Sequence, residues 1–225
     1  MYRAVIFDVD GTLVDSNDAH AHAWVLAITG SGRRVEFSRV RPLIGMGGDK
    51  LLPEIAGISI DAPEGKAIAQ KRRDIFRRDF LPHLQPTRGA RPLLQYLRNE
   101  GKRLVVASSA EEDELEDLLK VAGATDLIES ATSSDDAERS KPDPDIVVAA
   151  LQRTSHPPAE VIMVGDTPYD VEAAARAGIQ ILGLRSGGWS DQELKGALAV
   201  YADPADLLEH YDLSPFKRPL PVRSA

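Results

Sequence analysis

The chain has 225 residues, of which 43% are hydrophobic and 28% are charged, a composition typical of a globular protein. This length accommodates one typical domain with an inserted segment, and a core that buries most of the apolar surface. The formal net charge of -8 argues against broad nucleic-acid or anionic-membrane binding, because either partner favours a basic surface. The absence of cysteine excludes disulfides, thiolate metal sites and thiol nucleophiles.

The first apolar segment begins almost at the N-terminus, which leaves no room for a signal peptide, and no apolar run reaches membrane-spanning length. We therefore expect a cytoplasmic protein that acts on a small molecule, with neither nucleic acid nor a membrane as its partner. Nothing in the sequence demands more than a monomer.

Short apolar segments alternate with helical patterns along the chain. This alternation predicts an α/β fold in which helices cover both faces of a parallel sheet. Reactive residues are expected at the carboxyl ends of the strands in such a fold. The predicted strands are residues 3–8, 103–108, 126–129, 160–165 and 179–184.

Two capping patterns mark the starts of helices that follow strands. Ser109 and Glu112 predict a capping box for a helix that ends near Gly123. Thr167 and Asp170 repeat the pattern after the fourth predicted strand. Both patterns extend the alternation of strands and helices.

Almost a hundred residues separate the first predicted strand from the second, more than a crossover helix alone can use. Helical patterns occupy residues 17–29, 50–55 and 68–80 of this stretch. We therefore predict an inserted helical cap, whose return hinge is residues 85–87. The predicted parts are a Rossmann-like catalytic core of residues 1–15 and 86–212, a helical cap of residues 16–85 and a flexible tail of residues 213–225.

Asp8 and Asp10 follow the first apolar segment and precede Gly11, which permits a sharp turn. Residues two apart on a strand face the same side, so both carboxylates are predicted to point toward one ligand. Because two carboxylates repel one another where water is scarce, the pair needs a divalent cation or a shared proton. The pair suits a reaction in which one carboxylate attacks phosphorus and its neighbour transfers a proton. The alternative is a pair of acids that only caps a strand-to-loop turn.

Polar residues after the next two strands suit a phosphate. Ser108 and the free amides at the following helix offer hydrogen bonds to a phosphate oxygen, although Ser108 alone is also typical of a turn. Ser109 is predicted as a cap whose amide points at the ligand. Pro142 makes Lys141 extended, which holds its ammonium toward the carboxyl ends of the strands. There the charge neutralises phosphoryl oxygens and keeps Asp8 ionised.

Asp166 and Asp170 come directly after the fourth predicted strand. Carboxylates, water and phosphate oxygens are ligands that Mg²⁺ prefers, so Asp166 is predicted to join Asp8 on this ion. Asp170 has two interpretations of equal weight. It either caps the helix that begins near Thr167 or supports the metal ligands from behind.

Four strings, FDVDGTLVDS, VVASS, SKPDPDI and VGDTPYD, together resemble the motifs of the haloacid dehalogenase superfamily, in that family's order. The resemblance implies a Rossmann-like core in which Asp8 is the nucleophile. It implies that Asp10 is the general acid and base and also offers its backbone carbonyl to Mg²⁺. Ser108 and Lys141 are implied to hold the phosphoryl group, and Asp166 the metal.

The insertion resembles the helical cap of the branch that contains phosphoglycolate phosphatase and β-phosphoglucomutase. Asp10 indicates phosphate-ester chemistry, because haloacid dehalogenases proper lack an acid there. Phosphonoacetaldehyde hydrolases replace it with a small residue and use a cap lysine, a part for which Lys50 is the candidate. The string DSNDAH, which ends at His20, is similar to the start of the cap in β-phosphoglucomutase. His20 either assists Asp10, contacts a sugar hydroxyl or lies on the helix surface.

The glycine-rich string IGMGG, which contains Gly47, is predicted to be a flexible specificity loop facing the site, with Lys50 just beyond it. Residues 45–50 lack the arginine that such mutases present to a second phosphate, which favours a phosphatase. The basic residues of the third helical pattern are predicted to be mostly solvated, with one available to steer an anionic substrate. These residues are Lys71, Arg72, Arg73, Arg77 and Arg78.

The sequence therefore predicts a Mg²⁺-dependent phosphatase. Its expected substrate is a small phosphorylated metabolite, either a sugar or polyol phosphate or a compound like phosphoglycolate. A phosphomutase with the same reactive residues is the alternative, and a catalytically idle binding protein is the rival from another class.

Overall fold

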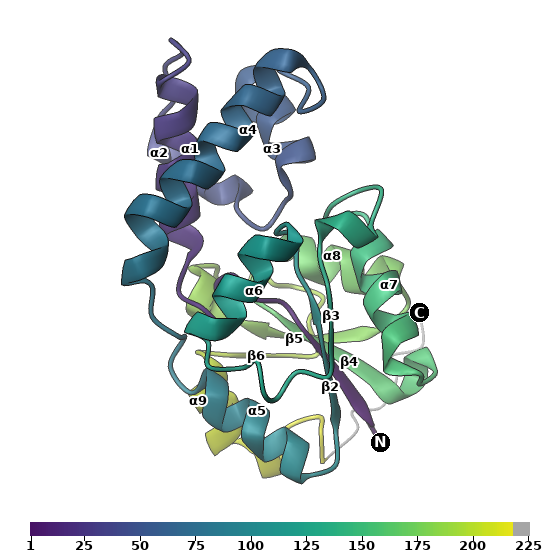
Figure 1. Ribbon diagram of the computed structural model, residues 1–225. Coiled ribbons are helices and arrows are strands. Elements are labelled where there is room, and N and C mark those ends of the chain that lie inside the picture. The colour runs from purple at the N-terminus through teal and green to yellow at the C-terminus, as the bar shows by residue number, and fades with distance from the viewer. Residues whose placement is uncertain (218–225) are drawn as a thin grey trace.

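The computed structural model describes residues 1–217, which form a parallel sheet between two layers of helices, with further helices above one end (Figure 1). The sheet has six strands in the order β3-β2-β1-β4-β5-β6, and every neighbouring pair is parallel. The strands are β1 (Ala4–Phe7), β2 (Arg103–Ala107), β3 (Ser130–Thr132), β4 (Val161–Gly165), β5 (Gln180–Leu184) and β6 (Ala199–Tyr201). The predicted α/β class with a Rossmann-like core is confirmed.

The central strand β1 lies fully buried between β2 and β4, which explains its unbroken apolar sequence. Val5 and Phe7 face one apolar cluster, and Ala4 and Ile6 face the other. This alternation follows from the two-residue repeat of a strand. The strand therefore joins the two halves of the core.

The prediction of the third strand was misplaced. Residues 126–129 lie outside regular strand, and β3 begins at Ser130, with Val105 of β2 paired to Ser130. Leu127 is nevertheless buried, so its apolar side chain packs into the core without joining the sheet. The short edge strand β6 was missed because its three residues carry too little pattern to stand out.

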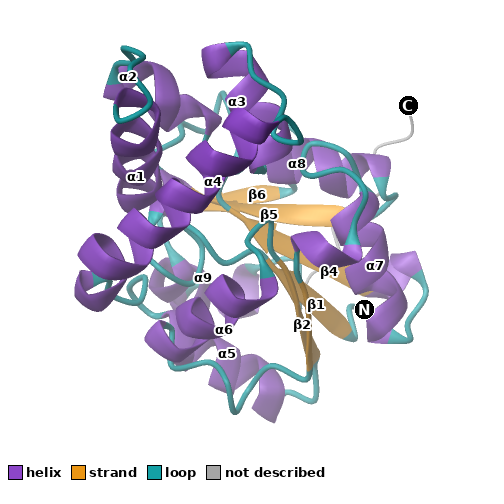
Figure 2. Cartoon of the chain, turned by 45° about the horizontal axis from the view of Figure 1, so that its top comes forward, coloured by secondary structure: helices purple, strands orange, loops and turns teal. Residues whose placement is uncertain are grey.

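Helices α5, α6 and α9 pack on one face of the sheet, and α7 and α8 pack on the other (Figures 1 and 2). The capping box of Thr167 and Asp170 is confirmed at the start of α8. The predicted box of Ser109 is wrong, because the N-cap is Glu111 and the amide of Glu112 donates instead to Asp135 Oδ2 at 3.2 Å. The bounds are α5 (Ala90–Asn99), α6 (Glu112–Val121), α7 (Asp145–Thr154), α8 (Pro168–Arg176) and α9 (Pro204–Glu209).

Between β1 and β2 the chain forms a group of helices that stands over the carboxyl ends of the strands, here called the helical insertion (Figure 1). Its helices are α1 (Asn17–Thr29), α2 (Phe37–Val40), α3 (Gly48–Ala56) and α4 (Pro63–Ile75), and a π-helical turn, Phe76–Phe80, continues α4. The chain leaves and returns at one place, because Val14 forms an antiparallel bridge with Pro86 and the Asp15 amide donates to the Gln85 carbonyl at 3.0 Å. Of the helices within residues 1–217, none combines the length and apolar character that a membrane crossing requires.

The start of the predicted flexible tail is packed rather than loose. Phe216 is 1% exposed, stacks on Tyr211 with ring centroids 5.3 Å apart, and meets the edge of Tyr2. Ser214 is also fully buried. The prediction of a tail was therefore wrong for residues 214–216, because Phe216 packs against an aromatic cluster despite the prolines around it. Residues 218–225 lie outside the described part of the chain.

Replacing Phe216 by alanine tests this packing. We expect Phe216→Ala to lower the free energy of unfolding by about 3 kcal/mol, the usual loss for a buried phenylalanine. Leu213→Ala is the matched control, because Leu213 is 64% exposed, and it should change stability little. Chemical denaturation monitored by circular dichroism measures both. Equal, small effects of the two substitutions would contradict the assignment of Phe216 to the core.

Candidate active site

The carboxyl ends of the three central strands bring the predicted reactive residues together. Asp8 follows β1, Ser108 follows β2 and Asp166 follows β4, and all three are buried. From β1 the chain adds β2 and β3 on one side of the sheet, and it then crosses over to add β4, β5 and β6 on the other side. Such a point in an open parallel sheet is where ligands bind.

Three buried carboxylates form a cluster at this edge. Asp8, Asp166 and Asp170 each contribute an oxygen, and these oxygens lie within 4.8 Å of one another. Asp166 accepts hydrogen bonds from Thr12 Oγ1 at 3.1 Å and from Asn17 Nδ2 at 2.8 Å. The two donors fix the direction of the Asp166 carboxylate toward Asp8.

Two glycines allow the backbone to approach Asp166 closely. A Cβ atom on Gly11 would lie 2.1 Å from Asp166 Oδ2, and one on Gly187 would lie 1.9 Å from the same oxygen. Gly11 also has φ of +74°, a conformation that favours glycine. Any larger residue at either position would fill the space beside the Asp166 carboxylate.

Lys141 supplies the positive charge of the cluster. Its Nζ donates to Asp8 Oδ1 at 2.5 Å and to the Ala107 carbonyl at 3.0 Å, and it pairs with Asp170 Oδ1 at 2.7 Å. Burial alone would lower the pKa of Lys141, but the carboxylates of Asp170 and Asp8 outweigh it and raise this pKa above its usual value. The ammonium therefore stays charged.

One ammonium does not balance three carboxylates. Burial, opposed by Lys141 and helped by repulsion from Asp170, raises the pKa of Asp8 from 3.8 to about 7. Burial and repulsion from Asp8 and Asp170 likewise raise the pKa of Asp166 well above its usual value. The excess negative charge and the space that Gly11 and Gly187 leave beside Asp166 fit a divalent cation.

Asp170 has the capping role that one interpretation predicted, and its support of metal ligands stays a prediction. Its Oδ2 accepts from the amide and the hydroxyl of Thr167, at 3.1 and 2.7 Å, which completes the capping box of α8. Its Oδ1 faces Lys141. Because both oxygens already have partners, Asp170 is suited to orient Lys141 rather than to bind a ligand directly.

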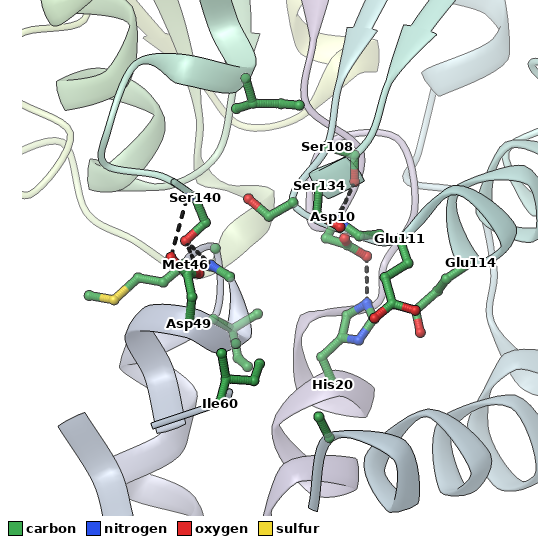
Figure 3. Close-up of a pocket in the computed structure, with 18 of the residues that line it drawn as sticks. Asp10, His20, Met46, Asp49, Ile60, Ser108, Glu111, Glu114, Ser134 and Ser140 are labelled. Carbon is green, nitrogen blue, oxygen red and sulfur yellow. Dashed lines mark hydrogen bonds and ion pairs between the residues drawn. The ribbon is translucent and has the colours of Figure 1, made fainter. Parts of the chain in front are cut away.

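Asp10 faces away from the cluster, toward the helical insertion (Figure 3). Its Oδ1 accepts from Ser16 Oγ at 2.5 Å and lies 2.6 Å from His20 Nε2. Burial alone would raise the pKa of Asp10, but His20, Ser16 and Arg72 outweigh it and lower this pKa to about 2. Asp10 is therefore a carboxylate in this arrangement.

A chain of polar contacts continues from His20 into the core. Arg72 Nη2 lies 2.6 Å from His20 Nδ1, and Arg72 Nη1 donates to both oxygens of Glu114 at 2.9 and 2.7 Å. Arginine can only donate, so Nδ1 of His20 accepts and Nε2 carries the proton that is donated to Asp10. His20 is 3% exposed and stacks on Phe76 at 4.1 Å, so the alternative of a surface residue is wrong.

Three of the five basic residues in 71–78 are exposed, as predicted, and Arg72 and Arg73 are partly buried in ion pairs. The side chains of Arg72 and Glu114 are 14% and 3% exposed, and their pair joins the helical insertion to α6. Arg73 pairs with Glu111, and Arg77 lies 3.8 Å from Asp113. The sequence did not indicate the buried pair of Arg72, because its partner Glu114 lies on a helix about forty residues away in the sequence.

A cavity of about 240 Å³ lies between the helical insertion and the strand ends (Figure 3). Asp8, Asp10, His20, Ser108 and Ser109 all line it. Ser109 Oγ is buried and has no hydrogen-bond partner within residues 1–217, which leaves it free for a ligand. Four of the predicted catalytic and substrate-contacting side chains therefore meet Asp8 at one cavity.

The glycine-rich loop reaches the same cavity but is tied to the core. The Gly47 amide donates to Ser140 Oγ at 3.0 Å, and Ser140 Oγ in turn donates to Asp49. Lys50, predicted to contact substrate, instead donates to Asp143 Oδ2 at 2.7 Å and lines a separate shallow hollow. This position of Lys50 differs from the prediction, because the ammonium of Lys50 pairs with Asp143, two residues beyond Lys141.

Sequence reasoning missed Thr12, Asn17 and the pair of Arg72 with Glu114. Thr12 and Asn17 lie in or next to the first motif, so their closeness to Asp8 and Asp10 was an available signal. No such signal existed for Arg72 and Glu114, because only the folded chain brings their helices together.

A sequence profile of the haloacid dehalogenase-like hydrolase family matches residues 5–184. The chain belongs to this family. It is 31% identical over 223 residues to phosphoglycolate phosphatase of Rhodospirillum rubrum, covering 92% of this chain and 90% of the relative. It is 29% identical over 200 residues to a probable phosphatase of Dickeya dadantii, covering 88% and 87%. The crystal structure of a hydrolase from Pseudomonas syringae has a TM-score of 0.87 and 32% identity, covering 93% of this chain and 98% of that one.

The charge excess in this haloacid dehalogenase-like hydrolase predicts a metal-dependent and pH-dependent stability. Without metal, the folded protein keeps Asp8 protonated up to about pH 7, whereas the unfolded chain releases that proton near pH 3.8. The metal-free protein should therefore lose stability as pH rises through this window. Mg²⁺ at about 100 times its dissociation constant at pH 8 should restore about 2.7 kcal/mol, and the same Mg²⁺ concentration should restore less at pH 5, where protons compete for the carboxylates. Thermal unfolding with EDTA or Mg²⁺ measures this.

Asp166→Asn is the informative variant for the same measurement. It removes one of the repelling charges, so the protein in EDTA at pH 8 should be at least as stable as wild type and should gain nothing from Mg²⁺. Asp212→Asn, at an exposed carboxylate, is the control and should respond as wild type does. A full Mg²⁺ response from Asp166→Asn would rule Asp166 out as a ligand.

The buried pair between α4 and α6 makes a second prediction. Arg72→Met leaves the Glu114 carboxylate buried without its partner and should lower the free energy of unfolding by about 3 kcal/mol. Arg77→Met breaks only exposed pairs and should have a much smaller effect. The double variant Arg72→Met with Glu114→Gln should recover part of the loss in urea denaturation. Similar effects of Arg72→Met and Arg77→Met would contradict this account.

Proposed function

We propose that the protein is a Mg²⁺-dependent phosphatase that hydrolyses a small phosphorylated metabolite through an aspartyl-phosphate at Asp8. The observation that carries the proposal is the position of the Asp8 carboxylate in the cavity, with Lys141 at 2.5 Å and Asp166 and Asp170 within 4.8 Å. The family and the names of its relatives support phosphate-ester hydrolysis.

In the first step, a carboxylate oxygen of Asp8 forms a bond to phosphorus while the bond from phosphorus to the alcohol oxygen breaks. Lys141 bonds Asp8 Oδ1, which directs Oδ2 to be the attacking atom. Ser108 and Ser109 line the cavity beside Asp8 and would hold the phosphoryl oxygens. Lys141 offsets negative charge on Asp8 and on the transferring group.

The second step needs a base for water, and Asp10 is the candidate. Water attacks the phosphorus of the aspartyl-phosphate, gives its proton to Asp10 and releases phosphate and the Asp8 carboxylate. The contacts from Ser16 and His20 keep Asp10 ionised, as a base requires. To protonate the departing alcohol in the first step, Asp10 must first carry a proton itself, which requires it to leave the pair with His20.

Asp8 and Asp166 are the side chains that would hold the magnesium ion, with the Asp10 carbonyl implied by family resemblance. When bound, the ion would offset the negative charge of the acidic cluster and of the phosphoryl group. The other roles belong to side chains of the protein. Asp8 is the nucleophile, Ser108 and Ser109 would hold the phosphoryl oxygens, and Asp10 would carry the proton.

The helical insertion is proposed to act as a cap over this site, with residues 16–85 as its extent and residues 1–15 and 86–212 as the core. Its contributions to the cavity include His20, Trp24 and Gly47. A closed cap excludes bulk water while the phosphate ester is bound, which protects the transfer of the phosphoryl group to Asp8 from side reactions.

Hydrolysis is favoured over the phosphomutase alternative by the glycine-rich loop. A mutase must bind a second phosphate near the cap, and Lys50 is the basic residue of residues 45–50. Lys50 is paired with Asp143 outside the cavity. Incubation with glucose 1-phosphate and a bisphosphate primer should therefore yield inorganic phosphate without glucose 6-phosphate.

The nucleophile is tested by Asp8→Asn. We expect release of phosphate from p-nitrophenyl phosphate to fall at least about a thousandfold, because the amide cannot form the aspartyl-phosphate. The fold should persist, since Lys141 keeps its contacts with Asp170 and Ala107. Asp212→Asn is the control and should retain wild-type activity. Undiminished turnover by Asp8→Asn would reject the mechanism, and an inactive wild type across a broad ester panel would revive the idle binding protein.

A further inference from the structure

The part of the cavity beyond the phosphoryl site has an apolar wall, and charged side chains line it on both sides (Figure 3). The apolar wall comes from the helical insertion and consists of Trp24, Ile44, Met46, Ile60 and Ala69. Such a wall suits the hydrocarbon face of an alcohol, while a few polar groups fix its orientation. The volume of about 240 Å³ limits that alcohol to a small metabolite.

The cations of this part of the cavity already have partners. Arg72 donates to both oxygens of Glu114 and also lies 5.6 Å over the ring of Trp24. Arg73 donates to Glu111 and to Gln70. A substrate that needed a guanidinium would have to displace one of these acids, and the displaced acid would remain beside it in the same cavity.

Carboxylates outnumber cations among the residues that line this part. Four acids face two arginines, which leaves an excess of two negative charges. The acids are Asp49, Glu111, Glu114 and Glu138. Figure 3 shows that Asp49 lies on one side of the cavity, and Glu111 and Glu114 on the other.

Glu138 stands out within this group. It lines the cavity from the loop that precedes Lys141, and its side chain makes neither a hydrogen bond nor an ion pair within residues 1–217. The neighbouring Arg139 instead pairs with Asp143 and Asp145. Glu138 is exposed to solvent, so its carboxylate adds a negative charge to the cavity lining without a bonded cation.

We propose that the alcohol part of the substrate is neutral or positively charged and carries no carboxylate or second phosphate. This inference rests on the proposed phosphatase function and narrows its substrate class. A hydroxyl or an ammonium can donate to Asp49 or Glu111, whereas an added anion meets like charges on both sides of the cavity. Like charges brought together at a binding site disfavour binding, which is how such a site rejects the wrong partner.

Three esters of nearly equal size test the proposal. They are 2-hydroxyethyl phosphate, O-phosphoethanolamine and phosphoglycolate, whose alcohol parts are neutral, cationic and anionic. We expect kcat/KM for phosphoglycolate to be at least about tenfold lower than for the other two. The inhibition constants of all three against p-nitrophenyl phosphate should follow the same order, so slow turnover of small esters does not prevent the comparison.

Charge reversal at Glu138 provides the matched variants. Glu138→Lys should raise kcat/KM for phosphoglycolate, lower it for O-phosphoethanolamine and leave 2-hydroxyethyl phosphate within about twofold. Glu209→Lys changes the net charge by the same amount at an exposed residue of α9, and should leave kcat/KM for all three esters unchanged.

The outcomes separate this proposal from the phosphatase assignment. If wild type processes or binds phosphoglycolate as well as 2-hydroxyethyl phosphate, the substrate class is wrong and the phosphatase remains. If Glu138→Lys and Glu209→Lys have the same effects on kcat/KM for the three esters, the charge of the cavity does not select the substrate. If none of the esters, including p-nitrophenyl phosphate, releases phosphate with Mg²⁺ present, the proposed function itself fails.

Discussion

The structure depends on an imbalance of charge at the centre of the sheet, where three buried carboxylates share one ammonium. Asp8, Asp166 and Asp170 are buried side by side and repel one another, and Lys141 compensates only part of this repulsion. The strands β1 and β4 that end here are entirely apolar, so the buried charged groups gather at one edge of the sheet. The excess negative charge suits this edge to bind a cation, and with it a transferring phosphoryl group.

A second set of charges operates between the helical insertion and the core. The arginines of α4 meet the acids of α6, and the most buried of these pairs reaches His20 and through it Asp10. Asp10, the residue proposed to move the proton, is therefore held by both the core and the helical insertion. Its ionisation depends on the contact between these two parts, which the isolated core would not reproduce.

Most of the core could be predicted from sequence, because its signals are local. The apolar runs of β1, β2, β4 and β5 and the capping box of Thr167 each depend on neighbouring residues. Errors arose where a distant partner decided the outcome. The amide of Glu112 donates to the distant Asp135 rather than to Ser109, and Lys50 pairs with Asp143 rather than with a substrate. Phe216 packs into an aromatic cluster that its proline-rich surroundings did not indicate. The site followed the same rule, since strand-end residues were foreseen and the pair of Arg72 with Glu114 was not.

The loop that carries Lys141 is fastened to the helical insertion on both sides of that residue. Ser140 accepts from the amide of Gly47 and bonds Asp49, and Asp143 accepts from Lys50. Lifting the glycine-rich loop to admit a molecule must break these bonds or carry the lysine loop along. Movement of the glycine-rich loop is thus coupled to the position of Lys141, the cation that pairs with Asp8. The reactivity of Asp8 therefore depends partly on whether this loop is closed.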